Sequence, residues 1–154
     1  MRLSKKTDYA LRTLFTLIEH SGRGPIPVRE LARRNEVPKR FLERILLEMK
    51  SQGWVQSLAG KKGGYLLARR PEQITMGQVV RYFDGNLAPL PCVSARHYRR
   101  CSQEPVCRFR RVLLEIRNCT HRLMERATLA RVYAGEPVRE EEVLEEAWVG
   151  GDGI

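Results

Sequence analysis

The sequence predicts a mainly α-helical fold: a winged helix-turn-helix with a small two-stranded wing and a long C-terminal dimerisation helix. Three observations carry this prediction. Apolar residues recur at helical spacing over residues 5–51, two strand-like runs bounded by glycines follow over residues 54–70, and a second helical stripe occupies residues 109–134. Two helices joined by a sharp turn and followed by a hairpin are the element order of a winged helix-turn-helix. At 154 residues, the chain is expected to form one domain, or one small domain with an appendage.

The helices of the first half are delimited by capping and breaking residues. The first helix is expected to begin after Ser4, a residue type that caps helix N-termini, and to end at the glycine- and proline-rich stretch 21–27. A short helix is expected over residues 28–37. Pro38 would end it and open the next helix, over residues 39–51, because proline is tolerated in the first helical turn. This third helix is expected to bury one apolar face made of Phe41, Leu42, Ile45, Leu46 and Met49.

The wing is expected as two strands, "WVQSLA" and "GYLLARR", joined by the glycine-bounded turn "GKKG". Another helix is expected between Thr75 and Gly85. A long helix over residues 109–134 then carries a single apolar stripe, and no later helix of comparable length could cover it. The same helix of a second copy would cover it, which predicts a homodimer. The stripe consists of Val112, Ile116, Cys119, Leu123, Ala127 and Ala130.

The positive charge is concentrated in the first half of the chain. Residues 1–70 hold sixteen lysines and arginines against six acids, whereas residues 71–154 hold twelve of each, so the first half carries the whole net charge of +10. Such a concentration indicates a polyanionic partner, with nucleic acid favoured over an anionic membrane surface. A membrane-surface helix needs a broad apolar face opposite an all-basic face, and the sequence offers none.

The sequence also predicts a cytoplasmic protein with no membrane partner. It has no apolar run near the ~20 residues that cross a bilayer, and the start "MRLSKKTDYALRTL" lacks the apolar core of a signal peptide. The cytoplasm keeps thiols reduced. Clustered cysteines there bind metal or undergo redox chemistry more often than they form structural disulfides.

The helix over residues 39–51 is expected to lie in the major groove of double-stranded DNA. Arginine can contact guanine edges, glutamate can accept from cytosine, and lysine mostly contacts phosphate. The alternative is a solvated helix whose charges serve only solubility, but the basic half together with the hairpin favours DNA binding. The residues predicted to contact DNA are Lys39, Arg40, Glu43, Arg44 and Lys50 on the helix, and Lys61 and Lys62 at the wing tip.

Three cysteines, Cys92, Cys101 and Cys107, lie in one arginine-rich loop with gaps of eight and five residues. Four interpretations compete. The first is a zinc site, but zinc sites favour closer cysteine pairs. The second is a thiol switch, which needs a reactive thiolate that neighbouring arginines would favour. The third is that the cysteines are incidental, but such cysteines belong in cores rather than in polar loops. An iron-sulfur cluster tolerates varied spacing. The six arginines and one acid over residues 96–111 would offset the negative charge of such a cluster, which favours this last interpretation.

The remaining candidate ligands and catalytic groups are weaker. Cys119 lies on the apolar stripe, where cysteine behaves as a small hydrophobe, so packing is its expected role. His97 lies inside the loop and could supply a fourth ligand, although a solvated histidine is the commoner outcome. The sequence contains no phosphate-binding glycine loop, paired carboxylates or nucleophile motif, so we do not expect an enzyme.

Several of these segments resemble the Rrf2 family of bacterial transcription regulators. The similar parts are the opening "MRLSKKTDYALRTL", the helix pair "LARRNEVPKRFLERIL", the wing "GKKGGYLLARRPEQITMGQVV" and the three-cysteine loop before a long helix. They cover nearly the whole chain except the acidic tail. The most specific are the cysteine trio and the wing sequence Gly63, Gly64, Tyr65, from which Gly63 and Tyr65 join the expected DNA-binding residues.

The resemblance implies a homodimer that binds an iron-sulfur cluster through Cys92, Cys101 and Cys107. In nitric-oxide-sensing members, an aspartate in the first helix of the partner subunit completes a 4Fe-4S cluster, and Asp8 occupies the matching position here. In cluster-assembly regulators a histidine follows the last cysteine by three residues, a position that Arg110 fills in this sequence. A 4Fe-4S cluster is therefore favoured, with 2Fe-2S as the alternative. The alternative role for Asp8 is that of an acid favoured by the helix dipole.

The sequence thus predicts a DNA-binding transcriptional regulator, a repressor or an activator, controlled by an iron-sulfur cluster that senses nitric oxide, redox stress or iron status. The alternatives are a cluster-free thiol-redox or zinc-binding regulator and, less favoured, an iron-sulfur electron carrier. The expected organisation is a winged helix-turn-helix over 1–84, a cluster-binding loop over 85–108, a dimerisation helix over 109–134 and an acidic, flexible tail over 135–154.

Overall fold

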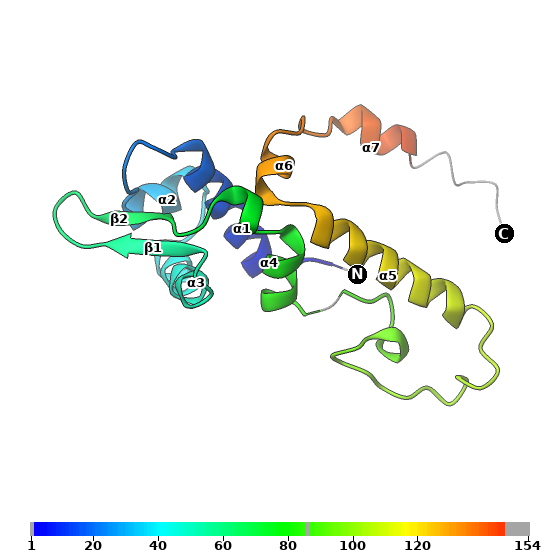
Figure 1. Cartoon of the computed structure of the whole chain (residues 1–154). Helices are drawn as coiled ribbons and strands as arrows, with labels where there is room; N and C mark the ends of the chain where they lie inside the picture. The colour runs from blue at the N-terminus through cyan, green and yellow to red at the C-terminus, as the bar shows by residue number, and fades with distance from the viewer. Residues whose placement is uncertain (1, 86, 147–154) are drawn as a thin grey trace.

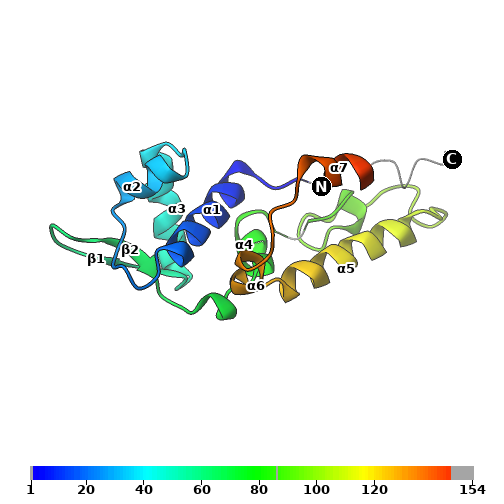
Figure 2. The same cartoon turned by 90° about the horizontal axis from the view of Figure 1, so that it is seen from above.

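The computed structural model describes residues 2–85 and 87–146 and confirms the winged helix-turn-helix. The molecule is elongated, with the wing and α3 at one end and α5 beside the cysteine loop at the other (Figures 1 and 2). The elements in chain order are α1 (Lys5–Glu19), α2 (Val28–Arg34), α3 (Lys39–Ser51), β1 (Val55–Leu58), β2 (Gly64–Leu67), the 3-10 turn η1 (Pro71–Gln73), α4 (Met76–Phe83), the 3-10 turn η2 (Pro91–Val93), α5 (Arg110–Arg126), α6 (Leu129–Tyr133) and α7 (Glu140–Glu146).

The first three helices form where capping and periodicity predict them. Ser4 caps α1, because its hydroxyl oxygen accepts from the backbone N–H of Thr7 at 3.2 Å. The helix α2 ends three residues before the predicted boundary, since Glu36 adopts a left-handed backbone conformation with φ of 54° and turns the chain toward α3. Pro38 is predicted at the first helical position of α3 but lies one position earlier, as the N-cap.

One core joins the helices to the wing and excludes one residue that was expected inside. Leu42, Ile45, Leu46 and Met49 are fully buried, but Phe41 is 38% exposed, so its predicted place on the buried face is wrong. Phe41 lies at the edge of that face, where its ring packs edge-on against Tyr9 of α1 instead of entering the core. The other fully buried core residues include Leu14, Leu31, Val55, Ile74, Val79 and Leu129.

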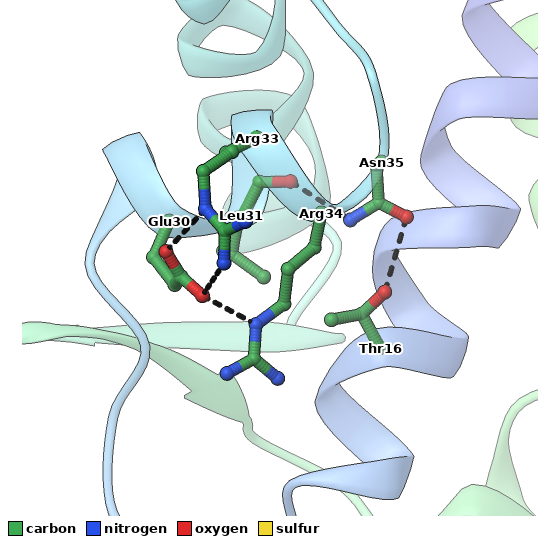
Figure 3. A network of polar contacts seen from close by, with 6 residues as sticks. All are labelled: Thr16, Glu30, Leu31, Arg33, Arg34 and Asn35. Atoms are coloured by element: carbon green, nitrogen blue, oxygen red, sulfur yellow. Dashed lines mark hydrogen bonds and ion pairs between the residues drawn. The ribbon is translucent and has the colours of Figure 1, made fainter.

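A buried amide fixes α2 against α1, as Figure 3 shows. The side-chain nitrogen of Asn35 donates to the Leu31 carbonyl at 2.9 Å, and its side-chain oxygen accepts from the Thr16 hydroxyl at 3.0 Å. Both polar ends of this 6% exposed residue are therefore satisfied. The contact sets the position of α2, and through the following turn the position of α3.

The wing is a two-stranded antiparallel sheet in which Val55 pairs with Leu67. A Cβ on Gly63 would collide with the Leu58 carbonyl oxygen, so the tip turn requires glycine there. Tyr65 exchanges two backbone hydrogen bonds of 2.9 Å with Ile26. The base of the wing is thereby held to the segment between α1 and α2.

The short helix α4 links the winged unit to the cysteine loop. Thr75 and Gln78 form a reciprocal capping box at its start. At its end, one carboxylate oxygen of Asp84 accepts from the Ser4 N–H at 3.0 Å and from the Thr7 hydroxyl at 2.8 Å. The first turn of α1 is therefore hydrogen-bonded to the residue from which the loop departs.

The continuous helix predicted over residues 109–134 is wrong, because the chain breaks between α5 and α6. The Ala127 carbonyl accepts from the Met76 N–H, and the Leu129 N–H donates to the Ile74 carbonyl, both at 2.8 Å. Thr128 then caps α6. The break turns Leu129 into the core, where it is fully buried, and removes Ala127 from the predicted stripe.

The helix α5 lies on the surface, and none of its residues is classed as buried in the described chain. The sequence predicts that Cys119 is packed on the apolar stripe. Within the described chain it is instead exposed, together with its apolar neighbours. Part of the tail predicted to be flexible over residues 135–154 forms α7, and residues 147–154 of that prediction fall outside the described residues. Across residues 2–85 and 87–146, no helix has both the length and the apolarity to cross a bilayer.

Candidate nucleic-acid interface and cysteine pocket

The exposed face of α3 carries a mixed row of charged and apolar side chains. Arg40, Glu43, Arg44 and Leu47 recur at three- and four-residue steps, opposite the buried face of the helix. Leu47, the last residue of this row, is 62% exposed. The sequence interpretation missed it, although the same helical spacing that located Arg40 and Glu43 would have located it. An apolar side chain at this position can contact a thymine methyl group in a major groove.

Two of the lysines predicted to bind DNA contact other side chains of the same chain. The Lys39 ammonium lies 3.4 Å from a carboxylate oxygen of Glu43, one helical turn away. The Lys50 ammonium donates to the Ser57 hydroxyl of β1 at 2.6 Å. Both lysines are exposed, so these are weak contacts that a phosphate group could replace.

The wing tip presents Lys61 and Lys62 to solvent, as the sequence predicted. Gly63 and Tyr65 lie beside them but have structural roles: Gly63 permits the tight turn, and partly buried Tyr65 packs against the core. The structure thus separates the exposed tip from the residues that hold it. Direct contact of Gly63 or Tyr65 with DNA stays a prediction.

Part of the positive charge in α2 is neutralised locally (Figure 3). The Glu30 carboxylate accepts from Arg33 at 3.0 and 2.8 Å and from Arg34 at 2.7 Å. Hydrogen bonds from these two guanidinium groups lower the pKa of Glu30 to about 2. The charges of Arg33 and Arg34 are therefore partly neutralised by the Glu30 carboxylate, whereas Arg40 and Arg44 of α3 are exposed to solvent.

A hollow of about 450 Å³ lies between the starts of α1 and α3, next to the exposed face of α3. Its lining includes Tyr9 and Phe41 together with Arg40 and Arg44. It therefore continues the surface of α3 with a depression lined by aromatic and basic residues. Lys5 and Pro38 complete its lining.

The three loop cysteines line one pocket of about 390 Å³ at the N-terminal end of α5. Cys92 lies in η2, Cys101 lies in the exposed part of the loop, and Cys107 lies just before α5. All of them are free thiols. The structure brings the three cysteines to the same cavity from segments up to fifteen residues apart, and their role as ligands stays a prediction.

Glu104 is the acidic residue in the lining of this cavity. Its carboxylate accepts from the Tyr98 hydroxyl at 2.9 Å and from the Cys101 N–H at 3.3 Å, and it lies 3.3 Å from the Arg110 guanidinium. Partial burial raises the pKa of Glu104. Hydrogen bonds from Tyr98 and the Cys101 N–H, with the charges of Arg110 and Arg100, lower this pKa by more, so the net shift is downward. The same hydrogen bond raises the pKa of Tyr98, which keeps the phenol protonated as a donor.

Arginines also attach the loop to neighbouring elements. The Arg110 guanidinium donates to the Cys92 carbonyl at 2.8 and 3.2 Å, and Arg117 of α5 donates to the Val93 carbonyl at 2.8 Å. Arg96 donates to the carbonyl of Arg81 in α4 at 3.3 Å. Part of the arginine excess therefore serves loop anchoring, which sequence alone could not distinguish from charge compensation.

The donor set suits an iron-sulfur cluster, but the thiols are not assembled into a coordination sphere. Thiolates in an irregular loop near several guanidinium groups are the ligands that such clusters use. Within residues 2–85 and 87–146, however, no three His, Cys, Asp or Glu groups lie close enough together to hold a metal ion. Cluster binding would therefore require the three thiols to move toward one another within the pocket.

Asp8 is not at the cysteine pocket of its own chain. Its carboxylate pairs with Arg12 one turn along α1, at 2.9 Å, and is 42% exposed. It lies next to Thr7, which is bonded to Asp84 at the start of the loop. A role as ligand would have to come through a partner subunit. His97 is exposed, and its backbone N–H donates to the Ser94 hydroxyl.

Comparison with known proteins agrees with this geometry. The family model described as "Rrf2: Iron-dependent Transcriptional regulator" matches residues 3–135. An rrf2-like HTH-type regulator of Rhodobacter capsulatus is 38% identical over 120 residues, covering 74% of this chain and 80% of that protein. The regulator NsrR of Geobacillus kaustophilus is 33% identical over 130 residues, covering 84% and 88% of the two chains.

The fold is also found in solved structures. The structure of CymR, described as the global cysteine regulator of B. subtilis, superposes with a TM-score of 0.74 at 25% identity and covers 89% of this chain and 99% of that one. These relatives are transcriptional regulators rather than enzymes. The chain therefore belongs to the Rrf2 family and is a transcriptional regulator, not an enzyme.

Proposed function

We propose that this protein is a cytoplasmic, homodimeric regulator, a repressor or an activator, whose affinity for double-stranded DNA is controlled by an iron-sulfur cluster on Cys92, Cys101 and Cys107. The observation that carries the proposal is that all three thiols line one cavity beside a helix none of whose described residues is buried. The description of the family as iron-dependent supports it. Such a cluster would supply a redox- and nitric-oxide-sensitive cross-link between the thiols, with 4Fe-4S favoured over 2Fe-2S.

DNA binding would place α3 in the major groove and the wing tip along the backbone. Arg40 and Glu43 project from the exposed face and would contact base edges, whereas Lys61 and Lys62 would contact phosphate. Lys39, Arg44 and Lys50 would add positive charge along the same groove. The concentration of the net +10 charge in residues 1–70 supports this mode.

Dimerisation would cover the apolar stripe of α5. Val112, Ile116 and Leu123 are 56%, 41% and 64% exposed on one face, and exposed Cys119 lies on the turn between the last two. Exposed apolar residues that repeat every three or four positions along a helix are suited to pairing with the same helix of a second copy. A two-fold dimer would present two α3 helices to a two-fold operator.

The residues around the loop would transmit a change at the thiols to the DNA-binding unit. Asp84 joins the start of the loop to Ser4 and Thr7 of α1, and Asp8 follows directly in the same turn. In a dimer, Asp8 of one subunit would complete the ligand set of the other. Regulation requires only that the two states differ in DNA affinity by about 1–3 kcal/mol.

The proposed cofactor is tested by purifying the reduced protein without oxygen and measuring iron, sulfide and visible absorbance. Wild-type protein and Cys119→Ala should be coloured and contain iron, whereas Cys101→Ala should be colourless but fold normally. Cys119 is the matched control because it is a free, exposed thiol outside the loop. Iron and colour that persist in Cys101→Ala would contradict the ligand assignment.

DNA binding is tested by measuring affinity as a function of salt. Replacing both Lys61 and Lys62 by alanine should weaken binding to all sequences alike and reduce the salt slope by about 2, one for each lost phosphate contact. Arg40→Ala should instead relax sequence preference. Equal losses on every sequence in Arg40→Ala would argue against base contact by Arg40.

A cluster-free thiol regulator is the second candidate. The free thiols, their lack of a common metal site within the described residues, and the likeness to a cysteine regulator favour it. In that case oxygen-free protein would be colourless and metal-poor. Its DNA affinity would change on thiol oxidation, and this change would be lost in Cys101→Ala.

A further inference from the structure

We propose that Glu104 and Arg110 form a latch that holds the segments of all three loop cysteines in place before any cofactor enters, with Arg110 acting as a positioning residue. Nothing in the sequence motif assigns either residue this role. The inference deepens the proposed function and rests on it for the identity of the cofactor. The organisation of the loop can be tested without that cofactor.

Glu104 holds the middle of the loop. Its carboxylate contacts the Tyr98 hydroxyl, which lies between the first and second cysteines, and the backbone N–H of Cys101, the second cysteine. The Glu104 N–H in turn donates to the Cys101 carbonyl at 3.2 Å, which closes a turn. Both the backbone N–H and the backbone carbonyl of Cys101 are thus hydrogen-bonded to Glu104.

Arg110 connects this centre to the two ends of the loop. Its guanidinium lies between the Glu104 carboxylate and the Cys92 carbonyl, to which it donates two hydrogen bonds. Arg110 is also the first residue of α5, three positions after Cys107. One ion pair therefore joins the first cysteine, the second cysteine and the helix that follows the third.

The environment of the pair strengthens it. The Glu104 side chain is 14% exposed, less than any other carboxylate in the ion pairs of the described chain, and the Arg110 side chain is 33% exposed. Reduced solvent screening makes a charge-assisted contact stronger than the exposed pairs on α1, α2 and α3. Both residues line the cysteine pocket itself.

The latch predicts what happens to the loop when the pair is lost. Without it, Cys92 and Cys101 are no longer tied to one another, and the thiols must be gathered from a broader set of conformations during cofactor assembly. Loss of either partner should have the same effect on this tie, because the link from Cys101 to Cys92 passes through both residues. A double variant should then be no worse than either single variant.

The first test measures backbone hydrogen exchange over residues 91–109 in the reduced, cofactor-free protein. Glu104→Gln, which keeps the acceptor oxygen, and Arg110→Met, which keeps the apolar stem, should each speed exchange about tenfold, as should the double variant. Arg99→Ala removes one loop charge from an exposed residue and should leave exchange unchanged. Unchanged exchange in α1 and α3 would verify that each variant is folded.

The second test follows the growth of visible absorbance when iron and sulfide are supplied to the same proteins without oxygen. Assembly should be about tenfold slower in Glu104→Gln, in Arg110→Met and in the double variant, and normal in Arg99→Ala. Wild-type rates in either single variant, or additive effects in the double variant, would overturn the latch. An altered cluster spectrum in Glu104→Gln alone would also overturn it, because Glu104 would then be a ligand.

Failure of the proposed function gives a different result. If wild-type protein takes up no iron, the cofactor proposal fails, and the exchange measurement still decides whether Glu104 and Arg110 organise the loop. If wild-type protein assembles a cluster while the variants exchange and assemble at normal rates, only the latch is wrong.

Discussion

The two halves of the molecule differ in how they are held together. The winged unit, residues 2–85, contains almost every buried apolar side chain, whereas residues 87–146 contribute only Val93 and Leu129 to that set. The second half is instead organised by polar contacts, among them those of Arg110 and Arg117 to backbone carbonyls. Its long helix leaves an apolar stripe in contact with solvent.

This difference indicates a division of labour. A unit with its own core keeps one structure whatever is bound, which suits residues that must read DNA with fixed geometry. A segment held by polar contacts, with its apolar surface uncovered, depends on a partner or a cofactor to complete it. Equivalent changes in the two halves should therefore have unequal effects.

The largest expected effect comes from truncating the same residue type in each half. Leu46→Ala should lower the free energy of unfolding by about 3 kcal/mol, because it opens a cavity in a fully buried position. Leu123→Ala, at a 64% exposed position, should lower that of the dilute monomer by less than about 0.5 kcal/mol. Chemical denaturation measures both, and equal losses would mean that α5 is already covered within the monomer.

A charge on the α5 stripe should sharpen the same comparison. Ile116→Glu should weaken the dimer by about 100-fold, roughly 3 kcal/mol, because pairing would bury an unpaired carboxylate. The winged unit should keep its helical content. Arg122→Glu introduces the same residue at an exposed position outside the stripe and is the matched control. Sedimentation over a range of protein concentrations measures the dissociation constant, and an unchanged dimer in Ile116→Glu would place the interface elsewhere.

The smallest effect concerns the acid stability of the winged unit. The pKa of Glu30 is lowered from 4.5 to about 2 by its hydrogen bonds with Arg33 and Arg34, so the folded state binds a proton less readily than the unfolded chain. The stabilisation is complete above pH 4.5 and is lost as the pH falls toward 2. Glu30→Gln should therefore lower the thermal midpoint slightly at neutral pH, and the difference from wild type should shrink across this window. A constant difference would show that the ion pairs contribute nothing.

Elements defined by local sequence were the most predictable. Ser4 caps α1 as expected, α4 lies within the predicted segment between Thr75 and Gly85, and the spacing of Leu42, Ile45 and Met49 located the buried face of α3. These features depend on residues within one or two turns. The cysteine cluster was also identified locally, because its three thiols lie within sixteen consecutive residues of a polar loop, where free cysteine is uncommon.

Features set by distant contacts could not be predicted. The break before Thr128 depends on backbone hydrogen bonds to Ile74 and Met76, more than fifty residues earlier. Similarly, the sequence distinguishes neither Arg110 from the other loop arginines nor Glu104 from an ordinary surface acid. Their roles arise only when the folded loop brings the Cys92 carbonyl to the same place.

The break also has a mechanical consequence. Since the Met76 N–H and the Leu129 N–H fasten the end of α5 to the strand-like segment before α4, the helix cannot swivel independently of the unit that carries α3. In a dimer paired along α5, each α5 would therefore move together with the winged unit and the α3 helix of its own subunit. A small change in the angle between the two α5 helices would then alter the distance between the two α3 helices without any rearrangement inside either subunit.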